Sequence, residues 1–102
     1  MNGYDIDGVL TAGHTIELPA VVISGRTFAE YDAFAKAAAE VCPVYIRGVG
    51  AYGDRYAAGL WKAEMIIKLG VTKFYEDDPV QIAIINELVP SCVVVQVEGA
   101  GR

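Results

Sequence analysis

The chain has 102 residues, of which 54% are hydrophobic, and its formal net charge is −5. This length and apolar content predict one domain, residues 1–102, with enough material for a two-faced sheet and its covering helices. The negative charge excludes a polycationic surface, so non-specific nucleic-acid binding is not expected and any such contact must be local.

The two cysteines indicate the compartment. Cys42 and Cys92 each lie beside valines at the start of a predicted strand, where small buried hydrophobic residues occur. We therefore expect free thiols in a reducing compartment and no disulfide. No apolar run is long enough to span a bilayer, and the N-terminus lacks a signal-like segment. Together these features predict a soluble, cytoplasmic protein without membrane contact.

The first distinctive stretch is Tyr4–Thr11, which contains Asp5 and Asp7 followed by Gly8. Residues two apart on an extended segment point to the same side, and glycine lets the chain turn away, so both acids are predicted at the end of a strand. A carboxylate can attack phosphorus when a divalent cation neutralises the converging charges, and a second carboxylate can move the proton. For an isolated Asp-x-Asp-Gly, two solvated acids in a turn are the simpler interpretation.

Residues 12–19 lack helical periodicity, which predicts a loop or small flap. His14, the only histidine, is predicted to face solvent within it, and no second histidine or nearby cysteine supports a zinc site. Residues 20–23 are continuously apolar, as expected for a buried parallel strand.

A turn of small residues, Ser24-Gly25-Arg26, is predicted next. Thr27 and Glu30 have the spacing of a capping box, and apolar side chains then repeat at helical spacing to Val41, so a helix is expected to begin at Thr27. Such a turn presents a hydroxyl and backbone N–H groups at a helix N-terminus, where an anion is favoured. Ser24 is therefore predicted to bind a phosphate oxygen, although a simple helix cap explains the turn equally well.

The second half of the chain repeats this alternation of strand and helix. Residues 44–46 predict a third strand, 47–55 a glycine-rich loop, and 56–69 a helix that contains Lys62. A lone lysine on a helix is usually solvated. Lys62 has a functional role only if the strand ends bring it near Asp5.

Residues 71–75 predict the fourth strand, which runs into Glu76-Asp77-Asp78-Pro79. Asp78 can cap the following helix, with Pro79 at its first position, and residues 92–97 predict a last strand. Three consecutive acids at a strand end repel one another unless a cation lies among them.

This order of elements predicts an α/β fold, a Rossmann-like three-layer α/β/α sandwich with a parallel sheet of about five strands. In such sheets, ligands bind beyond the carboxyl ends of the strands. Six candidate residues fall at those ends: Asp5, Asp7, Ser24, Arg47, Asp77 and Asp78. Their convergence carries the prediction, because none of them is specific alone.

These motifs resemble those of the haloacid dehalogenase (HAD) superfamily of phosphatases, in the same order and over nearly the whole chain. The residues that carry the resemblance are Asp5-Ile6-Asp7-Gly8-Val9-Leu10-Thr11, Ile23-Ser24-Gly25-Arg26, Lys62, and Glu76-Asp77-Asp78. The resemblance implies a Mg²⁺-dependent phosphomonoester hydrolase that forms an aspartyl-phosphate.

Roles follow from this resemblance residue by residue. It implies that Asp5 is the nucleophile and that Asp7 is the general acid/base. Mg²⁺ would be held by the Asp5 carboxylate, the Asp7 backbone carbonyl and Asp77, with Asp78 as a further ligand or orienting residue. The remaining catalytic roles fall to Ser24, which would bind the transferring phosphoryl group, and Lys62, which would balance the charge around Asp5.

One departure concerns the crossover after the first strand. The 19 positions from Asp5 to Ser24 are too few for the helix that the family usually has there, so we expect a loop and a thinly covered sheet face. A partner subunit would cover this face, so we expect a homo-oligomer. There is also no room for a cap domain, which predicts a HAD-like fold with an open site.

The substrate is suggested by a further resemblance, to the 3′-phosphatase domain of phage polynucleotide kinases. It rests on Gly53-Asp54-Arg55, residues 62–66 and residues 75–81. It implies a phosphorylated substrate that is a nucleic-acid 3′-phosphate or a nucleotide. The predicted substrate-binding residues are Gly25, Arg26, Arg47 and Arg55.

Two alternatives remain open. One is a non-catalytic HAD-fold binding or assembly module that keeps an acidic metal pocket. The other is a small-molecule phosphatase, acting on a sugar or nucleotide phosphate, whose site is closed by oligomerisation. The intact pair Asp5 and Asp7 favours an enzyme, because a scaffold has no need of the second acid.

Overall fold

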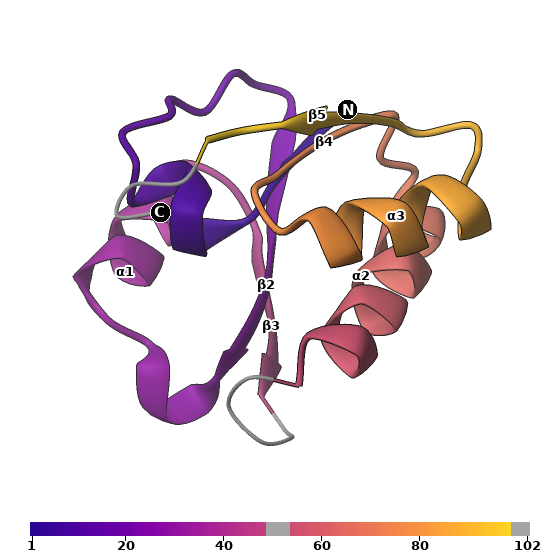
Figure 1. Ribbon diagram of the computed structural model, residues 1–102. Helices are drawn as coiled ribbons and strands as arrows, with labels where there is room; N and C mark the ends of the chain where they lie inside the picture. The colour runs from indigo at the N-terminus through magenta and orange to yellow at the C-terminus, as the bar shows by residue number, and fades with distance from the viewer. Residues whose placement is uncertain (49–53, 99–102) are drawn as a thin grey trace.

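The computed structural model describes residues 1–48 and 54–98. The strands are β1 (Asn2–Tyr4), β2 (Ala20–Thr27), β3 (Val44–Gly48), β4 (Lys73–Glu76) and β5 (Val93–Gln96); the helices are α1 (Ala33–Ala39), α2 (Arg55–Leu69) and α3 (Pro79–Leu88), with short helical turns η1 (Ile6–Leu10) and η2 (Phe28–Glu30). The strands form one parallel sheet in the order β3-β2-β1-β4-β5, with helices on both faces (Figure 1). The predicted three-layer α/β fold is confirmed.

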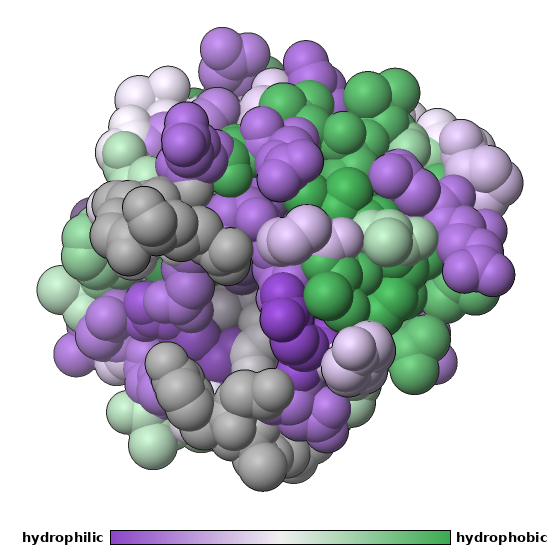
Figure 2. Space-filling view, viewed as in Figure 1, coloured by the Kyte–Doolittle hydropathy of each residue, from purple (hydrophilic) through white to green (hydrophobic). Residues whose placement is uncertain are grey.

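Two hydrophobic clusters cover the opposite faces of the sheet. Alternate residues of a strand point to opposite faces, so Val22 packs toward η1 and α1, whereas Val21 and Ile23 pack toward α2 and α3. Phe74 and Ile66, both without exposed surface, lie in the second cluster. On the surface, apolar residues gather over β5 and α3 and hydrophilic ones beside them (Figure 2).

The segment after Ile23 differs from the prediction, and the helix expected to begin at Thr27 is wrong. β2 continues to Thr27, with one extra residue relative to β3 between the pairs Ser24–Ile46 and Thr27–Gly48. A bulge of this kind lets a strand continue while re-aiming its side chains. The capping box of Thr27 and Glu30 forms, but it closes only the single turn η2.

A second start signal explains the short helix that follows. The carboxylate of Asp32 accepts hydrogen bonds from the backbone N–H groups of Phe34 and Ala35, and α1 begins directly after it. Ser24 is therefore not beside a helix N-terminus, and the anion site predicted on that ground is not formed.

The crossover from β1 to β2 contains the turn η1, whose Ile6 and Val9 are fully buried on the sheet, and then an extended loop. His14 is only half-exposed: its ring lies 4.6 Å from that of Tyr75 and 5.7 Å from that of Tyr4. The solvent-facing position predicted for it is wrong, because two aromatic rings stacked on the sheet offer it a packing surface.

Several other expectations hold. Asp78 caps α3, with Pro79 at its first position, and Cys42 and Cys92 are buried free thiols. The part of the predicted glycine-rich loop at 49–53 lies outside the described residues. In the described ranges, no helix is both long and apolar enough to cross a membrane.

The packing of α2 predicts that Ile66 and its neighbour Ile67 contribute differently to the free energy of unfolding. Ile66→Ala should lower the free energy of unfolding by about 2–5 kcal/mol, because it empties a fully buried position. Ile67 is 62% exposed, so Ile67→Ala should change the same quantity by less than about 0.5 kcal/mol. Urea denaturation of both variants measures this, and equal losses would contradict the orientation of α2.

Candidate functional site

A cavity of about 470 Å³ opens at the carboxyl ends of the strands. Predicted site residues that line it are Asp5, Asp7, Gly25, Arg47, Arg55, Lys62, Asp77 and Asp78. Residues to which the sequence analysis gave no site role, Glu76 and Gln81 among them, line it as well. A volume of this size suits a small organic ligand or the end of a larger one. The predicted convergence at the strand ends is therefore largely present.

Asp5 is the first residue after β1 and is 5% exposed. Its backbone N–H donates to the Tyr75 carbonyl, its Oδ1 accepts from the Ile6 N–H at 2.8 Å, and its Oδ2 lies 3.2 Å from Lys62 Nζ. Burial raises the pKa of Asp5 above its ordinary value, and the charge of Lys62 opposes that rise. Both oxygens are thus held in fixed positions at the cavity.

The structure places Lys62 beside Asp5, which was the condition for a functional role of this lysine. Its Nζ donates to Glu76 Oε2 at 2.7 Å and to Gln81 Oε1 at 2.6 Å, besides its contact with Asp5. Burial tends to lower the pKa of Lys62, but the charges of Asp5 and Glu76 raise it overall. Lys62 is therefore a buried ammonium.

Glu76 belongs to the fourth motif, but the sequence analysis gave it no role at the site. It ends β4, has no exposed surface, and lies beside Asp5 because Tyr4 pairs with Tyr75 in the adjoining register. Burial raises the pKa of Glu76 to about 7, the charge of Asp5 adds to the rise, and Lys62 opposes it. Residues at the ends of two neighbouring parallel strands lie side by side, so the closeness of Asp5 and Glu76 follows once β1 and β4 are known to be adjacent.

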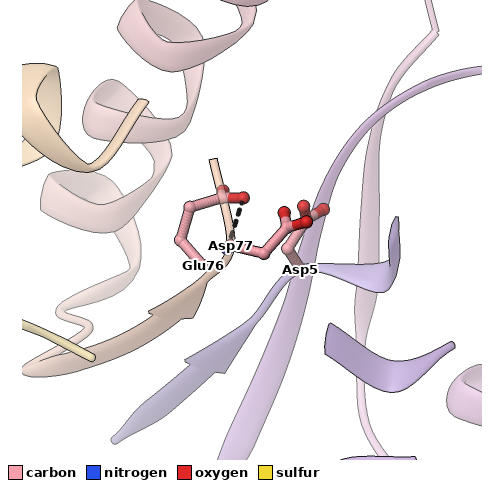
Figure 3. Close-up of side chains that lie close together, drawn as sticks. All are labelled: Asp5, Glu76 and Asp77. Carbon is pink, nitrogen blue, oxygen red and sulfur yellow. Dashed lines mark hydrogen bonds between the residues drawn. The ribbon is translucent and has the colours of Figure 1, made fainter. Parts of the chain in front are cut away.

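Asp5, Glu76 and Asp77 form a group that could hold a metal ion, with carboxylate oxygens within 4.8 Å of one another. Figure 3 shows the Asp5 and Asp77 carboxylates pointing toward each other, while Glu76 accepts from the Asp77 backbone N–H at 3.1 Å. Gly8 has a φ of +76°, and a Cβ atom there would lie 1.9 Å from Asp77 Oδ2. Glycine thus allows the close approach of Asp77.

Asp7 lies apart from this group. Its carboxylate is 63% exposed and is held by Arg26 through two hydrogen bonds, Nε to Oδ2 at 3.0 Å and Nη2 to Oδ1 at 2.8 Å. Arg26 Nη1 also contacts Asp32 Oδ1 at 2.7 Å and the Glu30 carbonyl at 3.0 Å. The structure therefore places Arg26, predicted to bind substrate, against Asp7 and α1 instead of along the cavity wall.

Three other predicted residues have different surroundings from those expected. Asp78 is outside the group that could hold a metal: it accepts from the Val80 N–H at 2.9 Å and is paired with Arg55 through two hydrogen bonds. Ser24 is fully buried, and its Oγ accepts from the Arg26 N–H at 3.2 Å instead of lining the cavity.

The comparisons with family models, curated proteins and solved structures return no match. The chemistry of the site is therefore argued from its donor atoms. Three carboxylates in one group are hard oxygen ligands, which suit Mg²⁺ and Ca²⁺ better than the softer metals that prefer thiolate or imidazole.

Gly8 gives the site a stability test. Gly8→Ala should lower the free energy of unfolding by more than Gly13→Ala, because both glycines have positive φ but only Gly8 lies against a carboxylate. The backbone cost common to both is about 1–2 kcal/mol, and the displacement of Asp77 adds to it for Gly8 alone. Urea denaturation of the two variants measures the difference, and equal losses would refute the approach of Asp77 to Gly8.

Proposed function

We propose that this protein is a Mg²⁺-dependent phosphomonoester hydrolase in which Asp5 is the nucleophile. The observation that carries the proposal is the setting of Asp5: a buried carboxylate, held by a backbone N–H and an ammonium, within 4.8 Å of two further carboxylates and open to a cavity. Phosphoryl transfer depends mainly on positioning and charge stabilisation, and this arrangement supplies both.

The donor set fits Mg²⁺, which Asp5, Glu76 and Asp77 would hold. Lys62 contacts both Asp5 and Glu76, so one positive charge faces two carboxylates and a net negative charge remains. When bound, the ion would neutralise this charge and that of the phosphoryl oxygens. The acidic pocket then accepts an anionic substrate.

The chain's own residues supply the covalent chemistry. An Asp5 oxygen attacks phosphorus, the ester P–O bond breaks, and the leaving oxygen takes a proton from Asp7, which carries that proton only when its ion pair with Arg26 opens. Asp7 then accepts a proton from the water that attacks the aspartyl-phosphate, which releases phosphate and restores Asp5. Asp7 lines the cavity, and the bidentate contact of Arg26 sets the orientation of its carboxylate.

We further propose that the protein is an uncapped member of the HAD superfamily. The order of the four motifs supports this, as does a parallel sheet in which the first motif directly follows β1 and the fourth begins at the last residue of β4. The predicted cytoplasmic location and the predicted homo-oligomer stay predictions, supported by the buried free thiols and by an apolar groove beside α1.

The first test is hydrolysis of an aryl phosphate with and without Mg²⁺. Wild-type protein should release phosphate only with the metal, and Asp5→Asn should fall to the uncatalysed background, because an amide cannot attack phosphorus. Glu87→Gln, an acid-to-amide change at an exposed position of α3, should keep the wild-type rate. Turnover by Asp5→Asn at the wild-type rate would exclude Asp5 as the nucleophile.

For the substrate, we propose a phosphate at a nucleic-acid 3′ end or on a nucleotide. Arg26 and Arg55 are engaged by carboxylates, whereas Arg47 lines the cavity and its guanidinium has no ion-pair or hydrogen-bond partner among residues 1–48 and 54–98. Arg47 is thus the arginine best placed to hold a flanking phosphodiester. Phe28 and Tyr56, 69% and 64% exposed, adjoin cavity-lining residues in the chain and offer ring faces for a base.

This assignment predicts a substrate-dependent effect of Arg47. Arg47→Gln should lower kcat/KM for a 3′-phosphorylated oligonucleotide by on the order of tenfold and leave an aryl phosphate nearly unaffected. Lys36→Gln removes an exposed charge on α1 away from the cavity and should change neither. The oligonucleotide rate should also fall as salt rises. A salt-independent preference for a sugar phosphate over the oligonucleotide and over a nucleoside monophosphate would favour a small-molecule phosphatase.

A further inference from the structure

Gln81 is a buried side chain of the site to which the reaction above gives no role. It lies in the first turn of α3, is 7% exposed and lines the cavity. Its Oε1 accepts a hydrogen bond of 2.6 Å from Lys62 Nζ. Gln81 therefore belongs to the same network as Asp5 and Glu76.

The Lys62 ammonium contacts three acceptors, two through hydrogen bonds and the third through an ion pair. They are Glu76 Oε2 at 2.7 Å, Asp5 Oδ2 at 3.2 Å and Gln81 Oε1 at 2.6 Å, each from a different element or its end. The Lys62 side chain is 3% exposed, so water does not substitute for a missing acceptor. With all three contacts made, the ammonium has one orientation and faces Asp5.

A neutral acceptor suits this position. Two carboxylates already contact the ammonium, and a third would add negative charge where a phosphoryl group has to approach. An apolar residue would leave a buried N–H donor without a partner, which is unfavourable. Glutamine satisfies the donor without changing the charge of the pocket.

Helix packing brings Gln81 to Lys62. Gly59 lies one turn before Lys62 on α2, and a Cβ atom there would lie 2.9 Å from Ile84 Cδ1 and 3.3 Å from Gln81 Cγ. The absence of a side chain at Gly59 therefore lets α2 and α3 approach closely at this turn. Asp78 caps α3 and so sets where this helix begins, directly after β4. The start of α3 and its close packing on Gly59 together determine the position of Gln81.

We propose that Gln81 is a positioning residue: by accepting a hydrogen bond from Lys62, it holds the ammonium against the reacting carboxylate of Asp5. This rests on the proposed phosphatase function. Gln81 acts through Lys62 and not by contact with the substrate, so its loss should slow the chemical step and leave substrate binding unchanged.

Three variants test this with an aryl phosphate and saturating Mg²⁺. Gln81→Met keeps the length of the side chain but removes the acceptor, and should lower kcat by about tenfold while KM changes by less than about twofold. Gln81→Glu keeps an acceptor oxygen for Lys62 but adds a negative charge where the phosphoryl group approaches, so it should raise KM while its kcat stays well above that of Gln81→Met. Ile84→Ala disturbs the same contact between α2 and α3 without touching Lys62, and should lower stability while kcat is kept.

Each outcome shows whether the role of Gln81 or the proposed function is wrong. If Gln81→Glu has a wild-type KM and a kcat as low as that of Gln81→Met, an acceptor oxygen at this position does not restore the reaction and the positioning role is wrong. If Ile84→Ala lowers kcat as much as Gln81→Met, the effect is one of helix packing and the proposal also fails. An active wild type with unchanged kcat in Gln81→Met refutes the role of Gln81 alone. A wild type without turnover refutes the proposed function, and the role of Gln81 falls with it.

Discussion

The buried ammonium of Lys62 is the interaction on which the rest of the site depends. It is 2% exposed and joins the end of β1, the end of β4 and the first turn of α3 to the middle of α2. Two carboxylates could not be buried at these strand ends without a cation between them, because an unpaired buried charge is strongly destabilising. The same contact that permits Asp5 to be buried therefore also fixes α2 and α3 on the sheet, and the geometry of the site is coupled to the fold.

The sheet order explains why these acids meet. From β1 the chain runs outward to β2 and β3, then returns to β4 and β5 on the other side, so the direction of winding changes between β1 and β4. Crevices form at such points beyond the strand ends, because the connections leave in opposite directions. Asp5 follows β1, and Glu76 and Asp77 lie at the end of β4, on the two sides of this point. The pairing of Tyr4 with Tyr75 then sets the two carboxylates side by side.

The sequence predicted this architecture because its apolar runs and capping residues are local signals. Asp78 and Pro79 marked the start of α3, whereas the residues alone left it open whether Lys62 reaches Asp5, which the structure shows. The predictions from the sequence were wrong where contacts between distant residues determine the structure. The bulge that extends β2 depends on pairing with β3, and the partner of Arg26 depends on where α1 begins. The buried position of Glu76 follows from strand register, which no local pattern specifies.

Charge pairing around the cavity bears on an apparent conflict between an acidic chain and the anionic substrate that we propose for it. Arg26 neutralises Asp7, and Arg55 neutralises Asp78, so two carboxylates at the cavity are compensated before a ligand arrives. Burial tends to raise the pKa of Asp78, yet Arg55 and the Val80 N–H hold it below its ordinary value, so this pair stays ionised. Asp5, Glu76 and Asp77 form the group at the cavity that could hold a metal ion. An anion that enters the cavity beside Arg47 would therefore meet a positively charged side chain. The net charge of −5 acts mainly on an anion that is still in solvent, where salt screens the repulsion.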